Sequence, residues 1–223
     1  MITVTTQSLS EMTDEAICYS LEHQLNLVDT FGANPQWEYT FPDRIALIGE
    51  QSRMFAAQII GTVNGDSLWR WAWADPGLPD SAGRLAANAR IYGTFHNIAA
   101  FTEPAVWVDT STAILLSAAI KTISHRWTSF TFSPAPGWQV HAALTEPAIT
   151  LPPATATSTA QVIGAAAELI WDVPRALSAY ARQRELLALR RGKQVSIGRD
   201  RWRVDVQLGS HDQIVALHID EDG

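Results

Sequence analysis

The segment Leu68-Trp-Arg-Trp-Ala-Trp-Ala-Asp75 is the part of the sequence that decides the fold. Side chains alternate along a β-strand, so we expect the indoles of Trp69, Trp71 and Trp73 to share one face of a sheet. Each indole can bury roughly 150–250 Å², and three together would dominate a core beneath a helix. Alternatively, one end of this ladder opens into an aromatic pocket, where the same three residues would contact a ligand. The pattern leaves both interpretations open.

Short strand patterns and two helical patterns surround this segment. Pro42-Asp43 and Asn64-Gly65 mark turns, and the second pair is a strong hairpin signal because Asn and Gly both tolerate positive φ. We expect a first helix that Ser10 or Thr13 caps and Gly32 ends. The expected elements that follow are strands at 37–41, 44–48, 53–60 and 68–74 and a helix over 81–92 that ends at Gly93.

The second half of the chain repeats the order of helix and meander. Asp109 or Thr110 caps a helix that runs to about Ser124, and a hairpin over 126–132 and 138–144 follows. The proline-rich stretch 147–158 is the best linker candidate, because prolines fit neither a sheet ladder nor a helix interior. After it we expect a helix from Ser158 to Trp171, a second helix or a kink at Pro174 that extends to Gly192, and strands at 194–197, 202–208 and 214–219.

These patterns predict an α+β fold in which antiparallel meanders pack against helices. The predicted units are residues 1–148, a Trp-rich domain, and residues 158–223, a smaller unit of helix and three strands. Whether the smaller unit is separate or integral to a single domain stays open.

The Trp segment also resembles an uncharacterised bacterial family, common in actinobacteria, with the strand motif W-x-W-A-W-A-[ND]. The residues that carry the resemblance, which spans roughly residues 15–100, are Ala57, Gln58, Gly61 and Thr62, then Trp69, Trp71, Ala72, Trp73 and Ala74. The family motif usually ends in Asn, whereas this chain has the charged Asp75. The resemblance implies a cytoplasmic α+β domain and names no reaction.

Composition excludes several classes of protein and site. The 223 residues are 47% hydrophobic and 17% charged, as in an ordinary globular domain, and no apolar run approaches the length of a membrane span. The N-terminal residues lack the pattern of a signal peptide, and Cys18 is the only cysteine. We therefore expect a cytoplasmic protein with no disulfide, no cysteine-based metal site and no cofactor.

The net charge of −7 conceals a strongly basic segment. Residues 175–203 hold nine of the 16 Lys and Arg residues but only two of the 23 acidic residues, so the segment carries +7 and the remainder −14. Its basic side chains are solvated, or they bind an acidic protein partner, the acidic remainder of their own chain or a second copy of the chain. Nucleic acid is disfavoured by the negative total charge. The candidate partner-binding residues are Arg182, Arg184, Arg201 and Arg203.

Motifs that would indicate catalysis are absent from the sequence. It contains no phosphate-binding glycine loop, no nucleophile elbow and no histidine pair with metal-ligand spacing. The first functional hypothesis is therefore a non-catalytic binding or interaction module. The alternative is an enzyme of unrecognised type that uses a Trp-lined cleft near Asp75 and His96, since a loop containing His96 could approach the end of the Trp strand.

Overall fold

The computed structural model of the chain describes residues 8–199 and 201–221 and confirms the α+β class. The chain forms two compact units, one containing His23–Thr150 and the other containing Ser10–Glu22 together with the chain from Leu151 onward. The long first helix therefore contributes its N-terminal half to the second unit, which the predicted boundaries of 1–148 and 158–223 did not anticipate.

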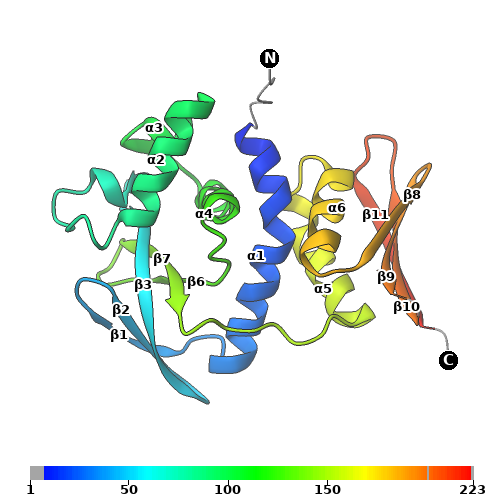
Figure 1. The fold of residues 1–223 in the computed structure, drawn as a ribbon, viewed down its shortest axis with the longest axis horizontal. Coiled ribbons are helices and arrows are strands. Elements are labelled where there is room, and N and C mark those ends of the chain that lie inside the picture. The colour runs from blue at the N-terminus through cyan, green and yellow to red at the C-terminus, as the bar shows by residue number, and fades with distance from the viewer. Residues whose placement is uncertain (1–7, 200, 222–223) are drawn as a thin grey trace. The chain divides into compact units, whose positions relative to one another are not determined.

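Helices pack around a curled antiparallel sheet in the first unit (Figure 1). Its elements, with all of the shared helix α1, are α1 (Leu9–Phe31), β1 (Gln36–Thr40), β2 (Arg44–Ile48), β3 (Ser52–Val63), β4 (Leu68–Trp71), the short 3₁₀ helix η1 (Ala72–Ala74), α2 (Arg84–His96), α3 (Ala99–Thr102), β5 (Ala105–Trp107), α4 (Thr110–Ser124), β6 (Ser129–Phe132) and β7 (Gln139–Glu146).

Strand β3 is the centre of this sheet. Its first half, Ser52–Ala56, pairs with β2, its last residues, Gly61–Val63, pair with β4, and β7 runs along Ala56–Val63. Helix α2 packs against β3 and against α4 (Figure 1). The long strand thus supports both the Trp segment and the helix that follows it.

Several local predictions for this unit are confirmed. Gly32, with φ of +89°, follows the last residue of α1. Asp109 caps α4 by accepting a hydrogen bond from the Thr112 N–H, and Asn64-Gly65 lies in the turn between β3 and β4. The side-chain oxygen of Asn64 accepts hydrogen bonds from the N–H groups of Asp66 and Leu68, which holds that turn closed.

The Trp segment is a strand for only half of the predicted length. Trp69 and Trp71 are fully buried on β4, but the chain leaves the sheet at Ala72, so Trp73 does not share their face. The reason is that the neighbouring edge of β3 is already occupied, because the Ile59 N–H donates to the carbonyl of Ala82. The predicted three-residue Trp ladder is therefore wrong at its third member.

Two glycines permit the close packing around these indoles. A Cβ at Gly61 would lie 2.6 Å from the Trp69 ring, and a Cβ at Gly93 would lie 2.6 Å from the Cβ of Phe101. Gly93 is thus a contact point inside α2 rather than its end, and the predicted helix stop is wrong. The helix ends three residues later, where Asn97 adopts a φ of +56°.

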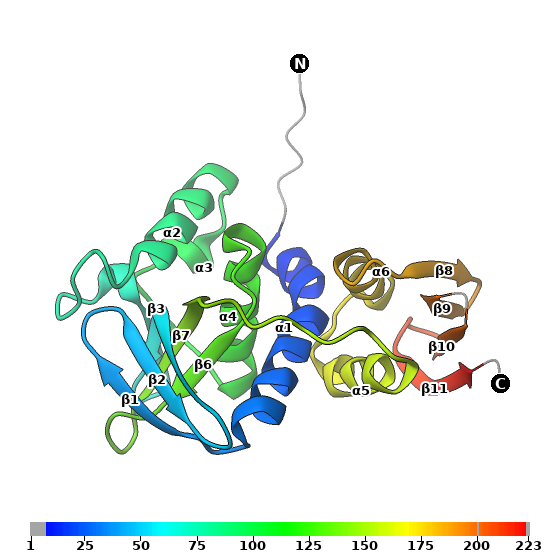
Figure 2. The ribbon, with the colours of Figure 1, turned by 60° about the horizontal axis from the view of Figure 1, so that its bottom comes forward.

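The second unit is a four-stranded antiparallel sheet with helices on one face (Figures 1 and 2). Its core joins apolar residues of α5 and α6 to those of β9 and β10. Its elements besides the N-terminal half of α1 are α5 (Ala156–Ala166), the 3₁₀ helix η2 (Ala167–Leu169), α6 (Val173–Gln183), β8 (Leu187–Arg191), β9 (Gln194–Arg199), β10 (Trp202–Leu208) and β11 (Ile214–Glu221).

The helix predicted to run to Gly192 ends instead at Gln183. Glu185 then takes a φ of +55°, the Leu186 N–H donates to the Ala181 carbonyl, and β8 begins. The unit consequently has four strands where three were predicted. Thr155 rather than Ser158 is the N-cap of α5, and the two side chains form a reciprocal capping box.

Acidic residues of α1 neutralise part of the basic segment within this unit. Glu11 pairs with Arg175 at 2.9 Å, and Glu22 pairs with Arg184 at 3.1 Å, with both side chains of the second pair nearly buried. Asp14 accepts hydrogen bonds from the backbone N–H groups of Trp171 and Asp172, and its burial raises the pKa of its carboxyl. These contacts fix α1 to the start and the end of α6.

Candidate functional site

A cleft opens where the chain leaves β4 and turns back toward α2. The loop from Asp75 to Gly83 forms one wall, and two hydrogen bonds hold that loop against β3. The Gln58 side-chain amide donates to the Ser81 carbonyl at 2.9 Å, and the Ile59 N–H donates to the Ala82 carbonyl at 2.8 Å. The loop is therefore fastened at its second half, beside the start of α2.

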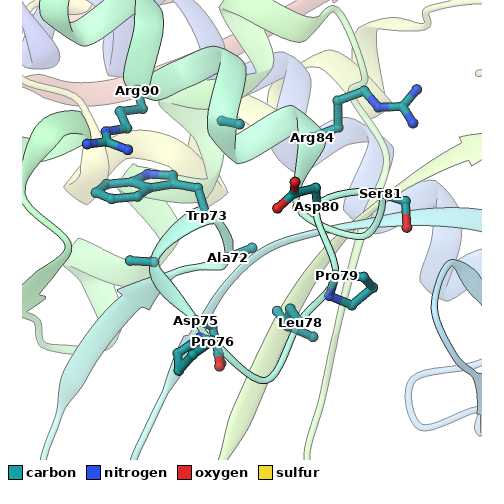
Figure 3. Close-up of a pocket in the computed structure, with 13 residues that line it drawn as sticks. Ala72, Trp73, Asp75, Pro76, Leu78, Pro79, Asp80, Ser81, Arg84 and Arg90 are labelled. Carbon is teal, nitrogen blue, oxygen red and sulfur yellow. The ribbon is translucent and has the colours of Figure 1, made fainter.

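This cleft, which we call the Trp73 cleft, has a volume of about 810 Å³ and is shown in Figure 3. That size is within the usual range of small-molecule sites. Its other walls come from η1 and from the first two turns of α2. The lining residues are Ala72, Trp73, Ala74, Asp75, Pro76, Leu78, Pro79, Asp80, Ser81, Gly83, Arg84, Ala87 and Arg90.

The indole of Trp73 forms the aromatic wall, and Arg90 lies over it. The central carbon of the guanidinium is 4.2 Å from the ring centroid, which is the distance of a cation–π contact (Figure 3). Stacking fixes the plane of the guanidinium while leaving its N–H groups at the edge, where they can donate to an anion. The Trp73 indole N–H is buried and has no hydrogen-bond partner among the described residues.

Four charged side chains surround the cleft in equal numbers of each sign. Arg84 and Arg90 come from α2, and Asp75 and Asp80 come from the loop. Within the described part of the chain, none of the four makes an ion pair. These charges are available to a ligand, since within the described residues no ion pair has to be broken first.

Asp75 also determines the shape of the loop. Its Oδ1 accepts a hydrogen bond from the Gly77 N–H at 2.9 Å, the arrangement of an Asx turn. An Asn side chain would accept the same bond, so the departure from the family-like motif preserves the turn and adds a negative charge to the cleft. The half-buried carboxylate keeps a second oxygen for a ligand.

A second cavity, of about 600 Å³, surrounds the exposed Trp171 in the second unit. Its two arginines are already neutralised, because Arg175 pairs with Glu11 and Arg190 pairs with Asp212 at 2.9 Å. A ligand would have to compete with these pairs. The Trp73 cleft is the better candidate for that reason.

The predicted tryptophans divide between core and cleft. Trp69 and Trp71 are fully buried, and the Trp71 indole N–H donates to the Ala100 carbonyl at 2.8 Å, so neither ring is open to a ligand. Only Trp73 lines the cleft. The structure therefore places Trp69 and Trp71 in the core and Trp73 on the wall of the cleft.

The structure does not bring Asp75 and His96 to one cavity. His96 lies on the last turn of α2, stacks on Tyr92 with a centroid distance of 4.0 Å, and lines a different hollow with Asn97 and Ile98. The predicted loop around His96 is helical because α2 extends past Gly93. Periodicity does not reveal this extension, since the glycine looks like a helix end.

The four predicted partner-binding arginines also lie in different environments. Arg184 is committed to Glu22 and additionally donates to the Pro152 carbonyl, so it is structural. Arg203 is exposed but pairs with Asp205 and Asp220 on its own sheet. Arg182 and Arg201 are exposed and make no ion pair with any described residue.

A buried polar cluster beneath α4 was not predicted. His141 on β7 lies within hydrogen-bond distance of Ser117 (3.3 Å) and Thr131 (3.2 Å), and the Lys121 amine donates to Ser129 at 2.9 Å. Burial lowers the pKa of Lys121 to about 7, and burial together with the Lys121 charge lowers the pKa of His141 to about 4. Shifts of this kind often mark catalytic groups, but neither residue lines the Trp73 cleft.

The sequence did carry a signal for the arginines of the cleft. Arg84, Ala87 and Arg90 recur every three residues along α2, so they follow one side of the helix. A small residue between two long cations leaves an opening between them. Without the position of the Asp75–Gly83 loop, however, that side of the helix looks like an ordinary solvated surface.

Comparison with known proteins identifies a family. A protein-family model described as a family of unknown function (DUF6882) matches residues 10–147, which include the whole Trp73 cleft and end before the C-terminal sheet. The predicted resemblance to an uncharacterised family is confirmed at this level. No curated protein and no solved structure matches the chain. Within residues 8–199 and 201–221, no helix is long and apolar enough to cross a bilayer.

Proposed function

The chain belongs to this family of unknown function, and we propose that it is a non-catalytic binding protein whose Trp73 cleft holds a small amphoteric ligand. The observation that carries the proposal is the set of four unpaired charges, two of each sign, around the indole of Trp73. A molecule that bears a carboxylate or phosphate and also an ammonium group, such as a short peptide, matches this set.

Each part of such a ligand has a defined counterpart in the cleft. The anionic group is recognised by Arg90, held in place by Trp73, and by Arg84. The ammonium group is recognised by Asp75 and Asp80, which come from the loop between η1 and α2 (Figure 3). The fastening of the loop by Gln58 supports the proposal, because a preorganised wall lowers the entropy lost on binding.

The enzyme alternative has less support. Its acid–base pair, Asp75 and His96, lines two different cavities. The residues with strongly lowered pKa values, Lys121 and His141, lie in the interior beneath α4 and outside the Trp73 cleft. We also propose a cytoplasmic location, which the single, buried Cys18 supports because the chain cannot form an internal disulfide.

Titration calorimetry with a panel of free dipeptides and their blocked forms tests the proposal. We expect a subset of free dipeptides to bind, and we expect N-acetylation or C-amidation of those dipeptides to weaken binding by about tenfold each, since each removes one charged hydrogen bond. Arg90→Gln should reproduce the effect of C-amidation. Arg126→Gln is the matched control, because Arg126 is an exposed arginine of the first unit that does not line the cleft.

Two results would contradict the proposal. Equal affinity for free and blocked dipeptides would mean that the charges do not select the ligand. Turnover of any bound dipeptide, detected by mass spectrometry after incubation with the purified protein, would favour the enzyme hypothesis over the binding protein.

A further inference from the structure

Strand β8 forms one edge of the C-terminal sheet. Strand β8 pairs with β9 on one side, and within residues 8–199 and 201–221 no strand pairs with its other side. All five of its residues are exposed, including Leu187 at 72% and Leu189 at 52%. An edge of this kind presents unpaired backbone N–H and C=O groups to an incoming strand.

The register defines which side chains such a strand would meet. Ala188 and Arg190 lie opposite Ile197 and Val195, which belong to the core, so Leu187, Leu189 and Arg191 project from the outer face. The outer face of β8 thus presents two apolar side chains followed by a cation. When a partner strand adds to a sheet edge, its side chains contact such alternating side chains of the edge strand, and these contacts give the specificity.

Positive charge flanks the strand at both ends. Arg191 and Lys193 lie at its C-terminal end, and neither makes an ion pair with a described residue. At the other end, the Arg199 guanidinium donates to the Arg184 carbonyl at 3.3 Å, which places the end of β9 beside the chain that leads into β8. Arg199 is exposed and makes no ion pair with a described residue, so it is the cation at this end of β8.

We propose that β8 is a docking edge for an extended acidic segment of a partner protein, which adds to the sheet as an antiparallel fifth strand. Acidic residues at both ends of that segment would face Arg191 and Lys193 at one end of β8 and Arg199 at the other. Its central residues would alternate, with apolar side chains over Leu187 and Leu189. A second copy of this chain is a poorer occupant, because two β8 strands side by side would bring together several arginines and lysines.

A fluorescein-labelled peptide, Asp-Glu-Thr-Val-Thr-Val-Asp-Glu, tests the proposal by anisotropy titration against the full chain. We expect it to bind at least about tenfold more tightly than the same peptide with lysine in place of its four acids. Two further peptides carry N-methyl groups on the odd-numbered or on the even-numbered residues. One of the two should bind at least about tenfold more weakly, because its N-methyl groups remove the backbone donors of the new ladder while the charge is kept.

The protein variants use exposed positions that are not expected to disturb folding. Arg191→Glu with Lys193→Glu should weaken binding of the acidic peptide at least about tenfold, and Leu187→Ser with Leu189→Ser should weaken it further. Arg126→Glu, a charge reversal in the first unit, should leave the affinity unchanged.

Three outcomes would overturn the proposal. Equal binding of both N-methylated peptides would show that no ladder forms. Unchanged affinity of the Arg191→Glu, Lys193→Glu protein would show that charge at β8 does not select the segment. The third outcome is that the wild-type chain dimerises in sedimentation, the Arg191→Glu, Lys193→Glu protein does not, and the acidic peptide fails to bind. This result would identify a second copy of the chain as the occupant.

Discussion

The Trp segment and the basic segment are the two strongest signals in the sequence, and they behave differently in the fold. Trp69 and Trp71 bury completely beside their own strand neighbours, as the local pattern predicts. In the basic segment, by contrast, Arg175 and Arg184 find their partners more than 150 residues away, on α1. Apolar periodicity therefore predicts burial locally, whereas the fate of a charge depends on contacts that periodicity does not encode.

The largest expected effect in this comparison of the Trp segment with the basic segment is at the Trp segment. Trp71→Ala should lower the free energy of unfolding by about 3–5 kcal/mol, because it removes a fully buried side chain and leaves a cavity. Trp73→Ala, two residues later, should cost about 1 kcal/mol or less, since Trp73 is half-buried on the cleft. Urea unfolding of both variants measures the difference, and equal losses would mean that Trp73 belongs to the core.

The buried ion pair of the second unit gives the next largest effect. Arg184→Met should lower the unfolding free energy by about 3 kcal/mol, because it leaves the carboxylate of Glu22 buried without its cation. Adding Glu22→Gln to that variant should recover part of the loss. Arg182→Met is the control, as an exposed arginine on the same helix. If Arg182→Met lost stability and Arg184→Met did not, Arg182 would be the structural arginine and Arg184 the surface one.

His141 makes the stability of the first unit depend on pH. Its pKa is about 4 in the fold and near 6.5 in the unfolded chain, so between these values the unfolded state holds more protons. The contribution of His141 to the free energy of unfolding is therefore constant above about pH 6.5. As the pH falls from 6.5 to 4, protonation of this histidine in the unfolded chain lowers the free energy of unfolding by about 2–3 kcal/mol. The difference between wild type and His141→Gln, measured by urea unfolding at pH 7.5, 5.5 and 4.5, should follow that window.

A matched control separates this effect from the other titrations of the chain. His125→Gln changes an exposed histidine at the end of α4 and should retain the wild-type dependence between pH 6.5 and 4. A His141→Gln protein that loses stability in parallel with wild type would show that His141 is already accessible to protons in the fold.

Sequence patterns predicted the element types of the first unit better than their ends. The hairpin at Asn64-Gly65 and the cap at Asp109 follow from local chemistry, and both are confirmed. The helix end predicted at Gly93 is wrong because glycine occurs both at helix ends and where a neighbouring residue packs closely. Only the position of Phe101 in the fold distinguishes the two cases. Arg190 and Arg191 were placed on a helix for a similar reason, since the turn at Glu185 has no glycine to mark it.

The candidate site was only partly predictable. Trp73 and Asp75, which line the cleft, are both candidates from the sequence: Trp73 as the third residue of the Trp ladder and Asp75 as the acid at the strand end that a loop containing His96 was expected to approach. Arg84, Arg90 and Asp80 were not, since the cleft exists only because the chain after Ala72 turns back to bond β3 at Ile59. The pairing of that loop with a strand edge is a tertiary choice with no local signature.

The smallest expected effect on stability distinguishes Arg201 from Arg203, which have the same pattern in the sequence. Arg203 lies between Asp205 and Asp220 on its sheet. Burial raises the pKa of Asp205, but hydrogen bonds from Ser196, Gln194 and Arg203 outweigh it and hold that pKa below its usual range. Arg203→Glu should therefore cost about 0.5–1 kcal/mol by replacing attraction with repulsion, whereas Arg201→Glu should change stability by less than about 0.5 kcal/mol. Raising the salt concentration from 0.05 to about 0.5 M should shrink the first difference, because the pairs are partly exposed and screened. If both reversals changed stability equally little in low-salt urea unfolding, the ion pairs of Arg203 with Asp205 and Asp220 would contribute nothing to stability.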